Sequence, residues 1–379
     1  MSPVSRPPSP QHPWPLLGGL TPRDFMQRHW QRRPLLVRQA LPRFAAPLSR
    51  TELFALAGRD DVESRLVRHT PRGGWSVAHG PFARSALPPV RRPGWTLLVQ
   101  GVDLHQDAAH ALLQSFRFVP DARLDDLMVS WASDGGGVGA HVDSYDVFLL
   151  QAHGRRRWRI ARRYDAALDE RAPLKVLRRF VAEQEFVLEP GDLLYLPPHW
   201  AHEGTAIGGD CMTCSIGMRA PQRGSLAAEL MQRLAEVSDD PLPYRDAHQP
   251  ATATPAAIPR ALEAFAAEAV RRLATRPSGV ARALGEVLSE PKPGIWFEKR
   301  ATPWRSRAVT LDRRTRMLYD HRHVFINGES VEARGKDATV LRRLADDRTL
   351  DARAVRGASR TVKSLLAEWF AAGWLHPDQ

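Results

Sequence analysis

Short strand-like segments separated by turn residues fill residues 62–218, and this spacing constrains the fold more than any other feature. The segments are rich in Val, Leu, Trp and Thr, and Gly or Pro stands between many of them. Closely spaced strands with such turns are typical of antiparallel sandwiches and barrels. We therefore expect a jelly-roll or cupin-like barrel, a fold that holds its ligand inside.

A candidate metal site begins in the stretch GGGVGAHVDSYDVFLLQAHGRRRWRI, residues 135–160. His141 and Asp143 are separated by one residue, so in an extended strand both side chains project to the same side. His202, in EPGDLLYLPPHWAHEG, is the third candidate ligand, and His199 competes with it for this position. Two imidazoles and one carboxylate are the ligands of non-haem Fe(II) oxygenases, which keep free positions for a co-substrate and O2.

A second candidate residue, Arg156, lies on the next strand-like segment. Alternation places Arg156 on the same face as Trp158 and Ile160, so it points into the core if Trp158 does. A buried guanidinium needs an anionic partner, and a carboxylate matches it through paired hydrogen bonds. We therefore expect a carboxylate-bearing co-substrate in the metal pocket.

Composition limits the partners and the compartment. The net charge of +12 comes from arginines spread along the chain, which fits either a solvated surface or an anionic partner such as RNA. The two cysteines, Cys211 and Cys214, indicate a reducing compartment, and their spacing in a strand turns them to opposite faces. No signal-like or membrane-spanning apolar run occurs, so we expect a soluble, cytoplasmic protein without a membrane partner.

Two further segments follow the strands, which gives expected domains at residues 1–221, 222–293 and 294–379. Residues 222–293 are Ala-rich and helical in pattern, with an apolar stripe that either forms internal core or mediates self-association. Residues 294–379 combine strands around an Asn327-Gly328 hairpin turn with helices at 337–345 and 362–372. This mixture resembles a winged helix. Because no basic recognition helix stands out, we expect a docking or scaffold role, with any nucleic-acid contact independent of sequence.

The two stretches that carry the candidate ligands closely resemble those of the bacterial ribosomal oxygenases. These are JmjC-type, 2-oxoglutarate-dependent arginine hydroxylases of large-subunit ribosomal protein L-sixteen. The resemblance covers residues 15–221 densely, including WSVAHGPF, WTLLVQGVDLH and SIGMRAP, and is looser beyond them. It implies an α+β chain with a double-stranded β-helix, then a helical dimerisation segment and a winged-helix-like domain. It also implies a homodimer.

The resemblance also implies roles for individual residues. His141, Asp143 and His202 would bind Fe(II), and Arg156 would bind the distal carboxylate of 2-oxoglutarate, with O2 as the second co-substrate. The position of His199 is commonly a small residue such as Gly in this family, which favours His202. Ser130, Thr213 and Ser215 lie on strands near the site and are candidates to hydrogen-bond the co-substrate. Two alternatives stay open: the same chemistry on a histidine or lysine of another protein, and a non-catalytic cupin and winged-helix regulator.

Overall fold

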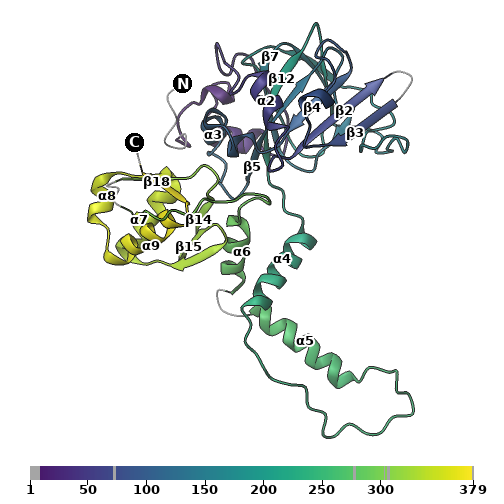
Figure 1. Ribbon diagram of the computed structural model, residues 1–379. Helices are drawn as coiled ribbons and strands as arrows, with labels where there is room; N and C mark the ends of the chain where they lie inside the picture. Colours follow the sequence, from purple (N-terminus) through teal and green to yellow (C-terminus); the bar gives the residue numbers. More distant parts are fainter. Residues whose placement is uncertain (1–8, 71–73, 276–278, 303, 305–307, 378–379) are drawn as a thin grey trace. The chain divides into compact units, whose positions relative to one another are not determined.

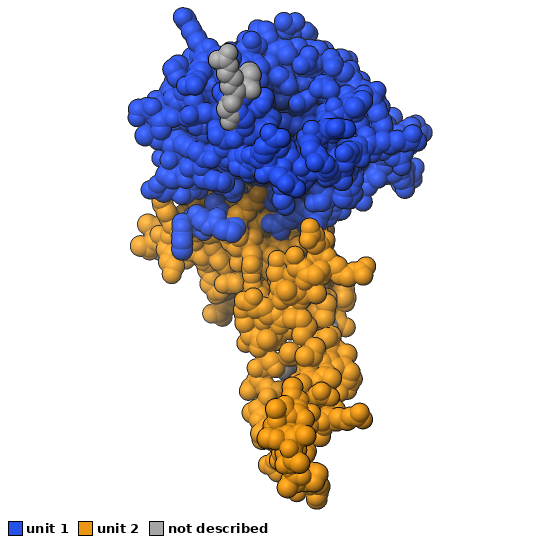
Figure 2. Space-filling view, turned by 90° about the vertical axis from the view of Figure 1, so that its right-hand side faces the viewer, with its two compact units in different colours: residues 1–220, 293–296 blue, residues 221–292, 297–379 orange. Residues whose placement is uncertain are grey.

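The computed structural model describes residues 9–70, 74–275, 279–302, 304 and 308–377. The chain divides into two compact units, distinguished by colour in Figure 2. Unit 1 comprises residues 1–220 and 293–296, and unit 2 comprises residues 221–292 and 297–379. Among the described residues, no helix is both long and apolar enough to cross a membrane.

Unit 1 is built on two antiparallel sheets (Figure 1). The large sheet has the strand order β1 (Leu35–Val37), β10 (Leu193–Leu196), β7 (Val147–His153), β12 (Cys211–Met218), β5 (Leu124–Ala132), β4 (Trp95–Val99), β2 (Ser64–Thr70) and β3 (Gly74–His79). The small sheet has the order β6 (His141–Val142), β11 (Ala201–Ala206), β8 (Arg156–Ala161) and β9 (Gln184–Leu188). Neighbours that are distant in sequence, such as β7 beside β12, are typical of a jelly roll. The expected double-stranded β-helix is confirmed.

The central strands of the large sheet, β10, β7, β12 and β5, are largely buried on both faces. One face, with Val129 and Trp131, belongs to the main hydrophobic core together with residues of three helices. These helices are α1 (Pro22–Arg28), α2 (Arg50–Leu56) and α3 (Asp107–Gln114), accompanied by the short 3-10 helices η1 (Pro15–Leu17), η2 (Arg84–Ala86) and η3 (Val102–Leu104). The other face meets the small sheet, where Leu149 of β7 and Trp158 of β8 share a second cluster. Successive residues of one strand therefore point alternately into the main hydrophobic core and into the space between the two sheets.

Local sequence signals set the starts of the first two helices. The Thr21 side chain accepts a hydrogen bond from the Asp24 backbone N–H at 3.0 Å, and Pro22 occupies the first turn. Ser49 and Glu52 form a reciprocal capping box at the start of α2. Both arrangements satisfy N–H groups that have no partner inside the helix. The pair Thr21-Pro22, a polar residue followed by proline, is the sequence signal for such a helix start, and the structure confirms it.

Pro190-Gly191 stands between two strand-like runs, a pattern that predicts a hairpin turn, but the two strands do not pair with each other. The strand before it, β9, pairs with β8 in the small sheet, whereas the strand after it, β10, pairs with β1 and β7 in the large sheet. The chain therefore crosses from one sheet to the other at this turn. The local signal marked the turn correctly, but the partner of each strand is chosen by long-range packing.

Unit 2 begins with three helices, α4 (Arg223–Glu236), α5 (Arg260–Thr275) and α6 (Gly279–Ser289). Two three-stranded sheets and three more helices complete it (Figure 1). One sheet has the order β17 (Thr349–Leu350), β13 (Val309–Leu311) and β18 (Leu375–Pro377), and the other has the order β14 (Met317–Tyr319), β15 (His323–Ile326) and β16 (Glu329–Glu332). The helices are α7 (Gly335–Asp347), α8 (Ala352–Gly357) and α9 (Arg360–Ala371).

Two local features of unit 2 bear on the sequence predictions. Asn327 and Gly328 both have positive φ, 48° and 87°, between the paired strands β15 and β16, so the predicted hairpin turn is confirmed. The helix α8 was not predicted. Its six residues are too few for a periodic pattern to stand out, and the Asp351 side chain begins it by accepting from the Ala354 N–H.

Candidate functional site

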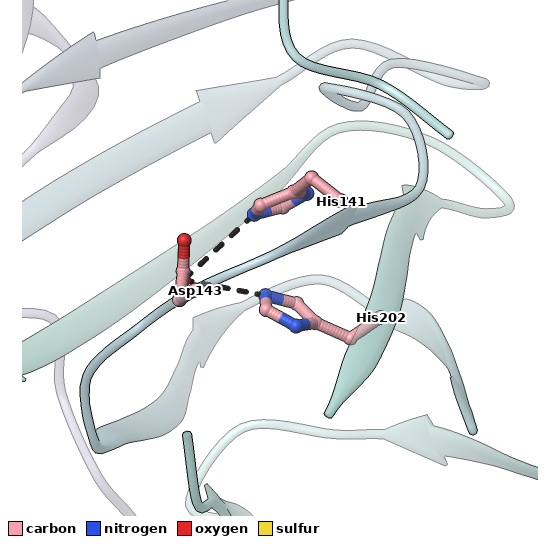
Figure 3. A group of neighbouring side chains, drawn as sticks. All are labelled: His141, Asp143 and His202. Atoms are coloured by element: carbon pink, nitrogen blue, oxygen red, sulfur yellow. Dashed lines mark ion pairs between the residues drawn. The ribbon is translucent and has the colours of Figure 1, made fainter. Parts of the chain in front are cut away.

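The small sheet brings His141, Asp143 and His202 together (Figure 3). His141 of β6 lies directly opposite His202 of β11 in the antiparallel pair, and Asp143 follows β6 on the same side of the chain. Nε2 of His202 lies 3.6 Å, and Nε2 of His141 3.9 Å, from Oδ2 of Asp143. One potential ligand atom from each residue lies within 4.8 Å of the other two. This arrangement fits two imidazole nitrogens and one carboxylate oxygen around one ion.

Both histidines are oriented by hydrogen bonds from the ring nitrogen that faces away from Asp143. Nδ1 of His141 lies 3.0 Å from the Gly139 carbonyl, and Nδ1 of His202 lies 2.9 Å from the Trp200 carbonyl. A carbonyl oxygen can only accept, so Nδ1 carries a proton, and in the neutral form of each ring Nε2 is the nitrogen with the lone pair. Burial, and next the neighbouring His141, lower the pKa of His202 to about 4. The His202 ring is therefore neutral at neutral pH.

Gly139 fixes the approach to His141. Its φ is +78°, a conformation that glycine adopts without strain, and a Cβ there would lie 2.8 Å from the Trp75 ring and from Val176. The close packing leaves the Gly139 carbonyl aimed at the His141 ring. Gly139, in the glycine-rich segment before His141, is therefore required by its positive φ and by the lack of space for a side chain.

His199 is not part of the cluster. It is exposed and has a φ of +62°, and its backbone N–H donates to the Asp143 carbonyl at 2.8 Å. A left-handed backbone is the conformation for which glycine is best suited, which agrees with a small residue at this position in the family. The structure thus places His202 beside His141 and Asp143, and turns His199 to solvent.

Arg156 lies inside the barrel on the same face of the small sheet as His202, and it is 3% exposed. Its Nη1 donates to the Ser130 hydroxyl at 2.9 Å and to the Thr213 hydroxyl at 3.2 Å. In the described ranges no carboxylate pairs with this guanidinium, and its Nε has no hydrogen-bond partner. Burial lowers the pKa of the Arg156 guanidinium. The site therefore holds a buried cation that lacks a protein anion.

Gly204 makes room for this cation. A Cβ at Gly204 would lie 2.7 Å from the Trp158 ring and 2.8 Å from Nε of Arg156, and the Gly204 carbonyl accepts from Nη2 of Arg156 at 3.4 Å. Any larger residue would displace the guanidinium. The sequence analysis missed Gly204. Its position two residues after His202, on the same face of the strand, was the available signal.

The three hydroxyl residues expected near the site differ in their contacts. Ser130 and Thr213 both bind Arg156, and Thr213 also donates to Oε1 of the buried Gln151 at 2.9 Å. Ser215 is buried two residues further along β12, on the same face as Thr213. Ser130 and Thr213 therefore orient the guanidinium.

Two other side chains near the motif have separate roles. Asp146 is fully buried and accepts from the Tyr195 hydroxyl at 2.6 Å and from Gln31 at 3.0 Å, so it holds the core together and does not face the metal. Tyr145 is 39% exposed, but its hydroxyl hydrogen-bonds Asp143. Burial, and next the charges of Asp143 and Asp126, raise the pKa of Tyr145. Tyr145 was not predicted from the sequence as a residue of the site, although it lies two residues after Asp143.

Comparison with known proteins matches both parts of the chain. A family model described as a JmjC domain matches residues 111–226, and one described as a ROXA-like winged helix matches residues 271–376. The ribosomal protein uL16 3-hydroxylase of Escherichia coli is 37% identical over 273 residues, which cover 71% of each chain.

Solved structures agree with the whole architecture. An X-ray structure of E. coli ycfD is similar with a TM-score of 0.82 and 32% identity, covering 93% of this chain and 97% of that one. A structure of YcfD, a ribosomal oxygenase from E. coli in complex with cobalt and 2-oxoglutarate, has a TM-score of 0.78 and 31% identity, covering 94% and 98%. The expected co-substrate and a metal are thus bound in a structure similar to this one. The fold, the histidine and aspartate cluster and the shared sequence together show that the chain belongs to the JmjC-domain ribosomal oxygenases.

Proposed function

We propose that this chain is an Fe(II)- and 2-oxoglutarate-dependent oxygenase that hydroxylates an arginine of ribosomal protein uL16. The observation that supports it most is the buried Arg156 guanidinium, which has no carboxylate partner among the described residues and lies on the triad's face of the sheet. The relative with 37% identity is named for uL16 3-hydroxylation. Bound Fe(II) and 2-oxoglutarate would supply the activation of O2.

The donor set suits the proposed metal. Neutral imidazole nitrogens and a carboxylate oxygen favour Fe(II) and similar divalent ions, and three ligands leave positions for a chelating co-substrate. His141, Asp143 and His202 would bind the ion through Nε2, Oδ2 and Nε2. The hydrogen bonds to the Gly139 and Trp200 carbonyls keep both rings in position before the ion arrives.

The remaining residues would orient the organic co-substrate. Arg156 would pair with the distal carboxylate of 2-oxoglutarate, because a buried guanidinium is stabilised by an anion held through hydrogen bonds. Ser130 and Thr213 would hold the guanidinium in place for that pairing, and Ser215 is a further hydroxyl within reach of the same face.

A cationic substrate side chain fits the surroundings of the triad. Tyr145 presents a partly exposed ring whose hydroxyl binds Asp143, and the Asp126 carboxylate acts electrostatically on the same phenol. An aromatic face and a carboxylate are groups that recognise a guanidinium. We propose that this edge of the site receives the substrate arginine, and that the enzyme works in the cytoplasm where ribosomes are made.

We also propose that the helices of residues 222–293 mediate a homodimer, as the sequence suggested. The helix α5 has no buried residue, and its exposed apolar side chains include Leu262, 37% exposed, and Val270, 54% exposed. Ile258, just before this helix, is 67% exposed. An apolar stripe left exposed on one helix is typical of a surface that packs against a second copy.

The substrate assignment is tested by mass measurement. We expect uL16 from a wild-type strain to be heavier by one oxygen than uL16 from a strain lacking this gene, with the oxygen on an arginine. Purified enzyme with Fe(II) and 2-oxoglutarate should add the same oxygen to uL16 from the deletion strain. An oxygen on a histidine, a lysine demethylation or no change in either experiment would reject the assignment.

The metal assignment is tested by His202→Ala and His199→Ala. Removal of His202 deletes a ligand, so Co(II) affinity, measured by calorimetry, should fall by more than the roughly 10–100-fold loss typical of a missing supporting residue. His199→Ala is the matched control and should bind Co(II) like the wild type, because His199 faces solvent. The reverse result would exchange the roles of the two histidines.

The role of Arg156 is tested by Arg156→Ala, with Arg157→Ala as the control on the opposite face of β8. Loss of a buried charged partner costs about 2 kcal/mol or more, so the apparent KM for 2-oxoglutarate should rise at least about 30-fold. Co(II) affinity should stay unchanged in both variants. An unaltered KM in Arg156→Ala would refute co-substrate binding by this residue.

The dimer proposal is tested by placing charges on the stripe. Leu262→Glu with Val270→Glu should convert the dimer to a monomer in sedimentation velocity, because buried unpaired carboxylates are unfavourable. Ala264→Glu with Thr275→Glu, both exposed and directed away from Leu262 and Val270 on α5, should leave the dimer intact. A wild-type protein that sediments as a monomer would disprove the dimer.

A further inference from the structure

The helices α8 and α9 of unit 2 carry four exposed cationic side chains, Arg353, Arg356, Arg360 and Lys363, here named the α8–α9 cationic face. Arg353 and Arg356 are three residues apart on α8, and Arg360 and Lys363 are three apart on α9, so each pair shares one side of its helix. The Lys363 ammonium donates to the Arg356 carbonyl at 2.9 Å. Because of this hydrogen bond, the cationic pair of α8 lies next to the cationic pair of α9. Both helices are labelled in Figure 1.

The sides of α8 and α9 opposite these cations pack into the hydrophobic core of unit 2, so the cationic side chains point to solvent. Val355 and Ala358 are buried at α8, and Val362 and Leu366 are buried at α9, all in the hydrophobic core of unit 2. Neither helix can therefore turn its arginines inward without exposing apolar area. The cationic face is held toward solvent by the fold of unit 2 alone.

The four cations have no neutralising partner within residues 308–377. No carboxylate pairs with any of them there, whereas Arg343 of α7 pairs with both Asp347, at 3.4 Å, and Asp351, at 2.8 Å. The nearby Asp337 accepts from the Ser359 hydroxyl at 3.0 Å, which occupies one of its oxygens. Like charges gathered without counter-charges repel each other, so an anionic partner would stabilise this face.

The geometry suits the backbone of a nucleic acid. The match to a ROXA-like winged helix, residues 271–376, includes α7, α8 and α9. The helix α9 follows α8 after a short turn, and the Ser359 side chain caps its start. In such motifs the exposed side of the second helix contacts nucleic acid. Thr361 is exposed on α9 and adds a hydroxyl donor, whereas the Ser364 hydroxyl donates to Glu368 at 3.3 Å. The helix α9 contains no Asn or Gln to read adenine.

We propose that the α8–α9 cationic face binds the sugar–phosphate backbone of RNA, without sequence specificity. The four positive charges and the Thr361 hydroxyl support a phosphodiester ligand. The choice of RNA over DNA rests on the proposed function, because a protein that modifies uL16 works where ribosomal RNA is abundant. This surface escaped the sequence analysis because α8, which contributes two of the four cations, was not predicted.

The binding test uses the full-length protein and a fluorescently labelled RNA hairpin. Arg353→Gln, Arg356→Gln and Arg360→Gln together should weaken binding at least about tenfold at low salt and reduce the salt slope by about three. Lys363 is kept because it supports the α8–α9 contact. The matched control changes three exposed arginines of unit 1, Arg91, Arg92 and Arg179, to Gln and should bind like the wild type.

Several outcomes would overturn the proposal. These are absence of RNA binding by the wild type, equal weakening in both triple variants, and an altered oligomeric state of the first variant, which would assign the arginines to a protein interface. Ultraviolet cross-linking in cells separates the two nucleic acids. The adduct should be removed by ribonuclease and absent from the Arg353, Arg356 and Arg360 variant, and an adduct removed by deoxyribonuclease would reject RNA.

Failure of this proposal can be told apart from failure of the proposed function. The triple variant should still hydroxylate isolated uL16, because none of its changes lies in unit 1, where the triad and Arg156 are found. Loss of RNA binding with retained hydroxylation supports the separate surface. Hydroxylation abolished together with RNA binding would show that the arginines serve catalysis and would overturn it.

Discussion

A guanidinium buried inside a barrel is the constraint on which the site of this protein depends. Arg156 is 3% exposed, and it is held by two hydroxyls and one carbonyl, none of which carries a negative charge. An isolated buried charge is costly, so the surrounding strands must supply hydrogen bonds and keep space for an anion. Gly204 leaves room for the guanidinium itself, and Ser130 and Thr213 supply hydrogen bonds. The hydroxyls of Ser130 and Thr213 and the small size of Gly204 thus all accommodate the buried guanidinium.

The same sheets provide the metal cluster through strand pairing. His141 and His202 face each other because β6 and β11 pair in register, and Arg156 shares their side of the small sheet because β8 pairs with β11. A shift of one residue in either pairing would turn one member of the set to the other face. The outer face of the large sheet is fixed in turn by aromatic packing, with Phe25 of α1 against Tyr195 of β10. Core packing thus sets the register on which the site relies.

Some arginines of the chain form ion pairs with carboxylates, and others do not. Many arginines pair with carboxylates, such as Arg117 with Asp121 and Arg314 with Asp312. The net charge of +12 therefore does not by itself indicate a partner. The arrangement of cations on α8 and α9, none of which forms an ion pair with a carboxylate in the described part of unit 2, is the more specific signal. It depends on a short helix and a turn that bring four residues to one side.

The sequence by itself determined those features that depend on strand alternation and on local turn chemistry. These include the shared side of His141 and Asp143, the inward direction of Arg156, the cap at Thr21 and the Asn327-Gly328 turn. Strand alternation and spacing left His199 and His202 as rivals, and the family resemblance favoured His202. The tertiary structure gave the geometric reason, because only His202 faces the cluster. It also decided that β9 and β10 belong to different sheets, and that Gly204 and Tyr145 border the site. These outcomes depend on contacts between residues far apart in the chain, which local patterns do not encode.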